Sequence, residues 1–231
     1  MSILGKIRRR LGRKPREDWR DEVPAAVLRR IKPGSAISIV DLGANQGDFT
    51  RALSMQYRIT GGLLVEALPG LAEKLRAEFK APVYRVEQCA VSDRAGVVSF
   101  QKNETEATSS LLKIKRDHAA FAGVPLEAET FEVRTRTLDE LAGEAGLAGI
   151  DLLKIDVQGA EDKVLAGAPG TLAQTRAVLV EISFKPLYEG SAVFWETYRM
   201  MDTNFRLVDV IPGFRAPDGE LLQADLLFVH R

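Results

Sequence analysis

The sequence predicts an α/β fold with a doubly wound, mostly parallel sheet. Residues 37–42 form a short apolar run that leads into a turn punctuated by glycines, and a helical pattern follows from Asp48. Runs of this kind suit strands that are buried on both faces of a parallel sheet. The succession of apolar run, strand-end acid and helix recurs along the chain, which has 231 residues, 45% of them hydrophobic. A chain of this size can bury a full core as one α/β domain.

The turn after the first strand, Asp41-Leu-Gly-Ala-Asn-Gln-Gly47, has the form of a ligand-binding loop. Gly43 and Gly47 let the backbone turn sharply and approach a ligand, and Asn45 between them tolerates a left-handed conformation. The free N–H groups of the following helix favour polar and anionic groups. The loop lacks the G-x-G-x-x-G spacing of dinucleotide sites. We therefore expect a nucleotide-type cofactor of another class; glycines that serve packing alone are the alternative.

The charge is balanced overall but uneven along the chain. Thirty-two basic and 32 acidic residues cancel, so no overall field favours a nucleic-acid partner. Residues 1–16 nevertheless hold seven bases and no acid, with apolar residues at helical spacing among them. A basic amphipathic helix can lie on an anionic membrane surface, and the alternative is an extension that is solvated or docked on the body. We expect no nucleic-acid partner, and peripheral membrane contact through residues 1–16 stays open.

The remaining composition favours a cytoplasmic protein without a metal site. Cys89 is the only cysteine, so no disulfide forms within the chain. No apolar run approaches the ~18 residues of a membrane span, and the first residues lack the apolar segment of a secretory signal. The two histidines, His118 and His230, belong to no cluster with metal-ligand spacing. The expected location is the cytoplasm, at the inner face of the membrane if residues 1–16 bind there.

The first half of the chain supplies three strands. Residues 1–36 read as a basic extension with a leading helix, and residues 37–231 as the folded domain. Glu66 ends the second strand, 19 residues after Gly47. At this position βαβ nucleotide folds place an acid that accepts hydrogen bonds from ribose hydroxyls. A surface carboxylate at the strand end is the alternative. The expected segments are a helix from Asp18 to Ile31, a helix around Phe49, Leu53 and Tyr57, a strand from Gly62 to Ala67, a helix around Leu71, Leu75 and Phe79, and a strand from Pro82 to Val86.

The middle of the chain is less regular. Gln88, Cys89 and Ala90 close the third strand, where in this topology they would lie beside the adenine of the cofactor. Cys89 is read as a packing residue rather than a nucleophile. The polar stretch from Asn103 to Ser110 reads as a loop whose hydroxyls either cap the next segment or contact a ligand. The other expected segments are a strand from Val97 to Gln101, a lid or mobile insert from Lys113 to Leu126, a strand from Phe131 to Thr137 and a helix capped by Thr137.

A second informative stretch, Ile150 to Glu161, reads as a strand ending in Asp156, a glycine turn and the start of a helix that runs to Leu172. Lys154 shares a strand face with Asp156 by period-two alternation. A lysine in a central strand is costly unless it is paired, so it should reach Asp156 or Glu161. The last expected segments are a strand from Arg176 to Ser183 that carries Glu181, a loop with Phe184 and Tyr188, a helix from Val193 to Met201, and a closing hairpin of Phe205 to Val210 and Leu226 to His230.

These strands converge on one crevice if the sheet has the order 3-2-1-4-5-7-6 with an antiparallel last strand. Ligands bind outside the carboxyl ends of the strands at the point where the order reverses, here between the first and fourth strands. That arrangement places residues 41–47 beside residues 156–161, with Glu66 on one flank and Glu181 on the other. Four strand-end acids from separate segments would then face one site.

Five motifs together are typical of one enzyme family. They are Asp41-Leu-Gly-Ala-Asn-Gln-Gly47, Val65-Glu-Ala-Leu-Pro69, Ala90-Val-Ser-Asp93, Arg136-Thr-Leu-Asp139, and Leu153-Lys-Ile-Asp-Val-Gln-Gly-Ala-Glu161 with Gly167-Ala168. Over residues 37–230 the set resembles the FkbM family of methyltransferases that use S-adenosylmethionine (SAM). Gln158 departs from the pattern, since the family often has Glu there, so we assign no essential acid role to that position. Residues 1–36 fall outside the resemblance.

The resemblance implies the Rossmann-like fold of class I methyltransferases, SAM as the cofactor, and methyl transfer to an acceptor hydroxyl on a sugar, a glycolipid or another natural product. As hypotheses, Asp41, Gly43, Asn45 and Gly47 shape the methionine end of the SAM site, and Glu66 holds the ribose. Further hypotheses concern the chemistry, since Asp156 would lie near the sulfonium and the acceptor, and Glu161 or Glu181 would orient or deprotonate the hydroxyl. Each of these acids could equally pair with Lys154 or cap a helix.

Two rival functions remain at this point. One is methyl transfer to nucleic acid or protein, which only the basic tail favours. Against it, the fourth strand ends in Asp156-Val-Gln-Gly159 rather than the Asn/Asp-Pro-Pro-aromatic run of many amino-methylating enzymes, and the body is acidic. The other rival is a SAM-binding protein without catalytic activity. An intact loop and intact strand-end acids argue against loss of the cofactor site, but they do not show turnover.

Overall fold

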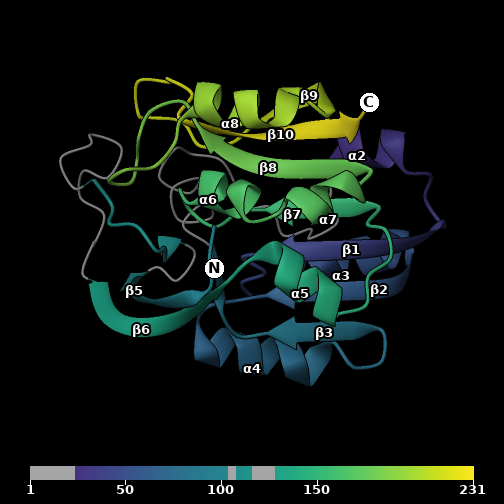
Figure 1. Ribbon diagram of the computed structural model, residues 1–231. Coiled ribbons are helices and arrows are strands. Elements are labelled where there is room, and N and C mark those ends of the chain that lie inside the picture. The colour runs from purple at the N-terminus through teal and green to yellow at the C-terminus, as the bar shows by residue number, and fades with distance from the viewer. Residues whose placement is uncertain (1–23, 104–107, 116–127) are drawn as a thin grey trace.

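A seven-stranded sheet forms the centre of the computed structural model, which describes residues 24–103, 108–115 and 128–231 (Figure 1). Its order is β3-β2-β1-β7-β8-β10-β9, which is 3-2-1-4-5-7-6 when these strands are counted along the chain. β10 is antiparallel to both of its neighbours and the other pairs are parallel. The predicted α/β fold with a mostly parallel sheet is confirmed. The strands are β1 (Ala36–Leu42), β2 (Arg58–Val65), β3 (Tyr84–Glu87), β7 (Leu152–Ile155), β8 (Ala177–Ser183), β9 (Phe205–Pro212) and β10 (Gln223–His230).

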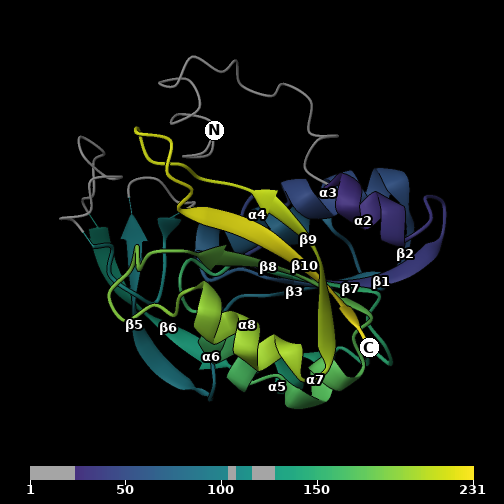
Figure 2. The same cartoon turned by 90° about the horizontal axis from the view of Figure 1, so that it is seen from above.

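Helices cover both faces of this sheet, as Figure 2 shows from above. On one face lie α2 (Ala25–Arg30), α3 (Asp48–Gln56) and α4 (Pro69–Glu78), and on the other α5 (Leu138–Glu144), α6 (Glu161–Ala166), α7 (Pro169–Ala173) and α8 (Phe194–Asp202). Each face has its own apolar core. Val27 and Leu53 pack with Ile39 on the first face, and Leu141 and Val164 pack with Leu153 on the second. The sheet is therefore the middle of three layers, buried on both sides as its apolar strands predict.

A second, smaller sheet lies beside the main one. It has the order β4-β6-β5, with β4 (Ala90–Val91), β5 (Gly96–Asn103) and β6 (Ala128–Arg136). β5 and β6 are antiparallel, and they correspond to the two strands expected here, except that β6 ends at Arg136 and Thr137 caps α5. Their assembly into a separate sheet was not predicted, because the sequence pattern does not tell which strands pair.

Several expected boundaries are wrong, and the second strand, for example, spans Arg58–Val65 rather than Gly62 to Ala67. The helix expected from Glu161 to Leu172 is broken into α6 and α7 at Gly167, where a Cβ atom would overlap the carbonyl oxygen of Ser92. The third strand begins at Tyr84 rather than Pro82, because the residues before it form a turn. In the leading helix, α2 begins only after Pro24, whose ψ of 138° is extended.

Several predictions concern residues that the structure does not describe. The basic segment 1–16, residues 18–23 of the leading helix, and residues 116–126 of the expected lid, with His118, lie outside the described residues. The division into residues 1–36 and 37–231 stays a prediction, although α2 packs on the same core as α3. Among the described helices, none has the length and apolar character to span a bilayer.

Candidate active site

The glycine loop after β1 and the turn after β7 meet at the point where the strand order reverses. A Cβ atom on Gly43 would overlap the carbonyl oxygen of Asp156. The backbone N–H of Asp156 in turn donates to the carbonyl of Leu42 at 3.2 Å. The sequence predicted this juxtaposition from the topology of the sheet, and the structure contains it.

The loop itself needs residues that tolerate a left-handed backbone. Gly43, Asn45 and Gly47 have φ angles of 73°, 51° and 80°. Asn45 therefore has the left-handed conformation expected of it. At Gly47 a Cβ atom would lie 2.6 Å from the ring of Phe79. Gly47 therefore also allows close packing, and packing was the alternative interpretation of the glycines. At Gly43 the missing side chain lets the second turn approach the loop.

Glu66 follows β2 and is fixed against the loop. Its Oε2 accepts a hydrogen bond from the backbone N–H of Asn45 at 2.9 Å, and its Oε1 accepts from that of Leu68 at 2.8 Å. The residue is only 7% exposed, so the alternative of a surface carboxylate is wrong. Burial raises the pKa of Glu66, although the backbone hydrogen bonds oppose that shift. Its proposed contact with a ribose stays a prediction.

A lysine that is largely but not fully buried connects the first strand with the second turn. Lys154 lies directly beside Asp41 in the register of β1 and β7. Its Nζ donates to Asp156 Oδ2 at 3.1 Å and lies 3.8 Å from Asp41 Oδ1. Pairing with Asp156 was predicted, and pairing with Asp41 was not. Burial opposes the charge of Lys154, but the carboxylates of Asp156 and Asp41 outweigh it and hold the pKa of Lys154 above its usual range.

Asp41 lies beneath the loop rather than on its surface. It is fully buried, and its Oδ2 accepts a hydrogen bond from Thr50 Oγ1 at 2.7 Å. Its Oδ1 has no hydrogen-bond partner among the described residues, with Lys154 as the nearest cation. Burial raises the pKa of Asp41, and the charge of Lys154 opposes that shift. Thr50 is a supporting residue that sequence reasoning missed.

Glu161 begins α6 and ties the second turn together. Its Oε1 accepts from the backbone N–H of Val157 at 3.0 Å, and its Oε2 accepts from that of Gly159 at 3.0 Å. The residue is 7% exposed. Burial raises the pKa of Glu161 to about 7 against the opposing effect of these hydrogen bonds. These contacts hold the turn before α6, whereas neither pairing with Lys154 nor a side-chain cap on the helix is present among them.

Gln158 joins the ends of two neighbouring strands. Its Nε2 donates to Asp156 Oδ1 at 2.7 Å and to Glu181 Oε2 at 3.1 Å. Its Oε1 accepts from the hydroxyl of Tyr188 at 2.7 Å, and Ser110 Oγ donates to its carbonyl oxygen at 2.6 Å. Ser110 therefore holds the second turn. Its Oγ also accepts a hydrogen bond from the backbone N–H of Leu112, as a cap would. The sequence singled out Gln158 only as a departure from a pattern, and it gave no sign of the contact with Tyr188.

Glu181 lies within a group of carboxylates. Its Oε2 also accepts from Gln223 Nε2 at 2.9 Å, and Asp225 is its partner in the register of β8 and β10. Burial raises the pKa of Glu181 well above its usual value, and the charges of Asp156 and Asp225 add to that shift. Within residues 24–103, 108–115 and 128–231, no group of three His, Cys, Asp or Glu side chains is arranged to hold a metal ion. The absence of a metal site stays a prediction.

The end of β3 lies next to Glu66. The backbone N–H of Glu66 donates to the carbonyl of Glu87 at 3.1 Å. Gln88, the next residue, is exposed, whereas Cys89 and Ala90 are buried. Burial raises the pKa of the Cys89 thiol to about 12, which agrees with a packing role. Gln88 and Ala90 lie where the sequence predicts contact with an adenine. Their contact with a cofactor stays a prediction.

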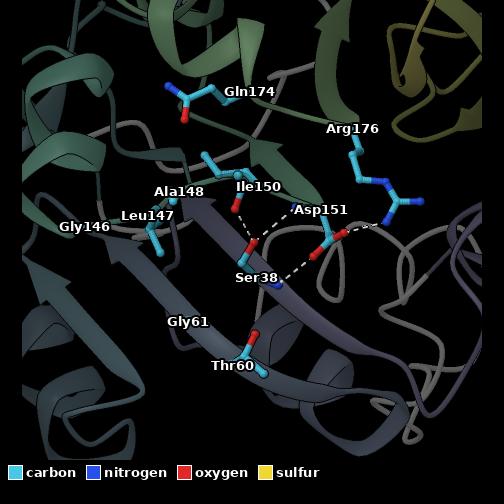
Figure 3. Close-up of a pocket in the computed structure, with 11 residues that line it drawn as sticks. Ser38, Thr60, Gly61, Gly146, Leu147, Ala148, Ile150, Asp151, Gln174 and Arg176 are labelled. Atoms are coloured by element: carbon cyan, nitrogen blue, oxygen red, sulfur yellow. Dashed lines mark hydrogen bonds and ion pairs between the residues drawn. The ribbon is translucent and has the colours of Figure 1, made fainter.

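A surface pocket lies at the opposite edge of the sheet (Figure 3). Ser38 at the start of β1 lines it, and the backbone N–H of Ser38 donates to Asp151 Oδ2 at 2.9 Å. Arg176, just before β8, donates from Nη1 to Asp151 Oδ1 at 2.7 Å. None of the predicted site residues lines this pocket. Parallel sheets bind ligands at the carboxyl edge, so the assignment of the site to the strand-end acids stays a prediction.

Comparisons with known proteins agree with this geometry. A family model described as the methyltransferase FkbM domain matches residues 41–209. The chain is 33% identical over 194 residues to the 2-O-methyltransferase NoeI of Sinorhizobium fredii, covering 80% of this chain and 77% of that one. It is 31% identical over 162 residues to the 31-O-demethyl-FK506 methyltransferase FkbM of Streptomyces tacrolimicus, covering 59% and 60%.

A solved structure supports the fold. The crystal structure of a methyltransferase FkbM from Methylobacillus flagellatus superimposes with a TM-score of 0.51 at 12% identity. The match covers 87% of this chain and 47% of that one, so this chain spans about half the length of that protein. The matched family model covers most of the folded part of the chain, including the two turns and the acids of the site. The chain therefore belongs to the FkbM family of methyltransferases.

Proposed function

We propose that the protein transfers a methyl group from SAM to a hydroxyl of a sugar, a glycolipid or another natural product. Two relatives support O-methylation by their names, since NoeI is a 2-O-methyltransferase and the Streptomyces FkbM acts on 31-O-demethyl-FK506. The observation that carries the proposal is the contact between residues 41–47 and residues 156–161, with Glu66 held against the first of these turns. The single buried Cys89, which has no partner for a disulfide within the chain, supports a cytoplasmic location.

The residues on the loop side fit a nucleoside with a polar tail. The left-handed turn at Gly43 and Asn45 leaves backbone groups close to the N-terminus of α3, where polar ligand groups are favoured. The Glu66 carboxylate has about four acceptor positions, and backbone N–H groups use only part of them. Acceptor positions on Glu66 therefore remain for hydrogen bonds from ribose hydroxyls. When bound, SAM supplies an electrophilic methyl group on a sulfonium.

On the acceptor side, Asp156 is the best candidate for the proton acceptor. Its side chain is 29% exposed, and Lys154 and Gln158 hold it in place. Glu161 is engaged with backbone N–H groups and acts as a positioning residue. As the proton acceptor, the Asp156 carboxylate would take the proton of the acceptor hydroxyl, and bound SAM would supply the methyl group. The remaining acceleration comes from holding the donor and the hydroxyl in line.

Calorimetric titration with SAM, and separately with NAD, tests the cofactor site. We expect SAM to bind with micromolar affinity, NAD not to bind, and Glu66→Ala to weaken SAM binding by about 1–3 kcal/mol. Glu73→Ala is the matched control, because Glu73 is an exposed residue on α4, and it should bind SAM as the wild type does. Binding of NAD, or equal SAM affinity in both variants, would overturn the assignment.

A second assay tests the reaction. Labelled SAM is incubated with a panel of hydroxyl acceptors that begins with sugars, and methyl transfer is followed in the products. We expect an O-methylated product, and Asp156→Asn should lower kcat by roughly 10²-fold or more because it lacks the proton acceptor. Transfer to nucleic acid or protein alone would favour the rival acceptor class.

A further inference from the structure

The uncharged side chain of Gln158 contacts both Asp156 and Glu181. Its amide nitrogen donates to Asp156 Oδ1 at 2.7 Å and to Glu181 Oε2 at 3.1 Å. These carboxylates belong to different strand ends, one after β7 and one on β8. Both hydrogens of a single NH₂ group are thus used to bring two acids together.

The orientation of this amide is set by Tyr188. The phenol hydroxyl donates to Gln158 Oε1 at 2.7 Å and also lies 3.4 Å from the carbonyl oxygen of Thr108. Burial raises the pKa of Tyr188 well above its usual value, so the hydroxyl keeps its proton and acts as a donor. Because Oε1 must face that donor, Nε2 must face the carboxylates.

The backbone fixes the direction of the side chain as well. Gln158 has a φ of 59°, in the left-handed region that residues other than glycine rarely adopt. Ser110 Oγ donates to its carbonyl oxygen at 2.6 Å. The following residue, Gly159, packs so closely that a Cβ atom there would lie 2.8 Å from the ring of Tyr188. A strained conformation of this kind persists only where its surroundings determine it.

The charges around the amide explain why a neutral donor is useful here. Asp156 has Lys154 as its cation at 3.1 Å. The charged groups that act most strongly on Glu181 are the acids Asp156 after β7, Asp225 on β10 and Glu161 on α6, and the cation Lys154. Negative charge is therefore in excess, and an acid at position 158 would increase it.

We propose that Gln158 is a positioning residue whose uncharged amide bridges Asp156 and Glu181 and thereby holds Asp156 where it receives the acceptor proton. The part of this inference that concerns the acceptor rests on the proposed function. The bridge itself can be tested in the protein alone. The hydrogen bond from Gln158 to Glu181 favours the charged form of the Glu181 carboxyl. Loss of this hydrogen bond should therefore raise the pKa of Glu181.

The first test is a titration of the Glu181 carboxyl by ¹³C NMR in the protein alone, with the signal assigned from Glu181→Gln. Gln158→Met keeps the size of the side chain but removes the amide, and Gln158→Glu adds a carboxylate. In both variants we expect the Glu181 midpoint to rise by on the order of half a pH unit or more. Gln174→Glu is the matched control, because Gln174 is exposed at the end of α7, and it should leave the midpoint unchanged.

The second test is the pH profile of kcat in the same variants. We expect Gln158→Met to lower kcat by roughly tenfold and to shift the profile, while the KM for SAM stays within about twofold. Tyr188→Phe should move kcat in the same direction by a smaller factor, because it frees the amide to flip. Melting temperatures are measured alongside to separate these effects from loss of folding.

The proposal is overturned if Gln158→Met folds and leaves both the Glu181 midpoint and the pH profile as in the wild type. It is also overturned if the control Gln174→Glu moves them as far as Gln158→Glu does. The titration needs neither SAM nor acceptor, so its result stands even if the wild type shows no methyl transfer. Failure of the proposed function and failure of this inference are therefore separate results.

Discussion

Gly43 and Asp156 are packed so closely that a Cβ atom on Gly43 would overlap the carbonyl oxygen of Asp156. The two residues belong to turns after different strands, β1 and β7, which are neighbours at the point where the sheet order reverses. Gly43 also has a φ of 73°, which residues with a side chain rarely adopt. The site is thus a direct contact between two turns, and a glycine makes that contact possible.

Gly43→Ala should therefore cost more stability than a left-handed backbone alone explains. Gly34→Ala is the matched control, since Gly34 has a φ of 83° and nothing within 4 Å of its Cβ position. We expect the control to lose about 1–2 kcal/mol of unfolding free energy. Gly43→Ala should lose on the order of 3 kcal/mol or more, because the second turn must move as well. Urea unfolding measures both, and equal losses would contradict the contact.

Asp139 belongs to a motif that carries the family resemblance, but its contacts are structural. Its carboxylate accepts hydrogen bonds from the backbone N–H groups of Gly170 at 2.9 Å and Thr171 at 2.6 Å, in the first turn of α7. Asp139→Ala should cost about 1–2 kcal/mol of unfolding free energy, as loss of a helix cap does. SAM affinity should stay unchanged. Asp218→Ala, in an exposed turn, is the control. A large loss of SAM affinity with intact stability would show that Asp139 has a role in the site.

Cys89 should be unreactive in the folded protein. It is buried, and burial raises the pKa of its thiol to about 12, so the reactive thiolate is scarce at neutral pH. We expect iodoacetamide at pH 8 to modify the native protein far more slowly than the urea-unfolded protein. Mass spectrometry of the modified chain measures the two rates. Rapid modification of the native protein would contradict the packing role.

The sequence predicted the parts of the site that depend on local pattern and topology. An apolar run followed by an acid and a glycine indicates a strand and its turn, and this located Asp41, Glu66 and Asp156. The left-handed conformation of Asn45 followed from residue type alone. Parallel strands place their carboxyl ends at one edge, so the meeting of the two turns could also be predicted.

What the sequence could not predict depends on pairing between distant segments. The neighbour of Lys154 across the sheet is Asp41, which follows from the register of β1 and β7 rather than from spacing. Tyr188 reaches Gln158 because a loop folds back over the turn, and no periodicity marks such a contact. The close contact between Gly167, after α6, and Ser92 from another segment is likewise not marked by any spacing, although Pro169 at the start of α7 is a local signal for the break itself.

The contribution of Glu161 to the stability of the folded state should fall as the pH rises. Burial raises the pKa of Glu161 to about 7 in the folded chain from an ordinary value of 4.5. Between these values the folded state binds more protons than the unfolded state does. Glu161 therefore favours folding fully below about pH 4.5, and this contribution is lost as the pH rises through about 7. Its size is on the order of 1–3 kcal/mol.

Urea unfolding of the wild type and of Glu161→Gln from pH 5 to pH 8 isolates this contribution, because glutamine does not titrate. The difference in unfolding free energy, wild type minus variant, should fall by about 1–3 kcal/mol over this range. Other buried acids, such as Asp41 and Glu66, titrate in both proteins and largely cancel in the difference. For the exposed control Glu73→Gln the difference should not change with pH. A difference that stays constant or rises for Glu161→Gln would mean that the carboxylate is ionised throughout, with its backbone hydrogen bonds outweighing burial.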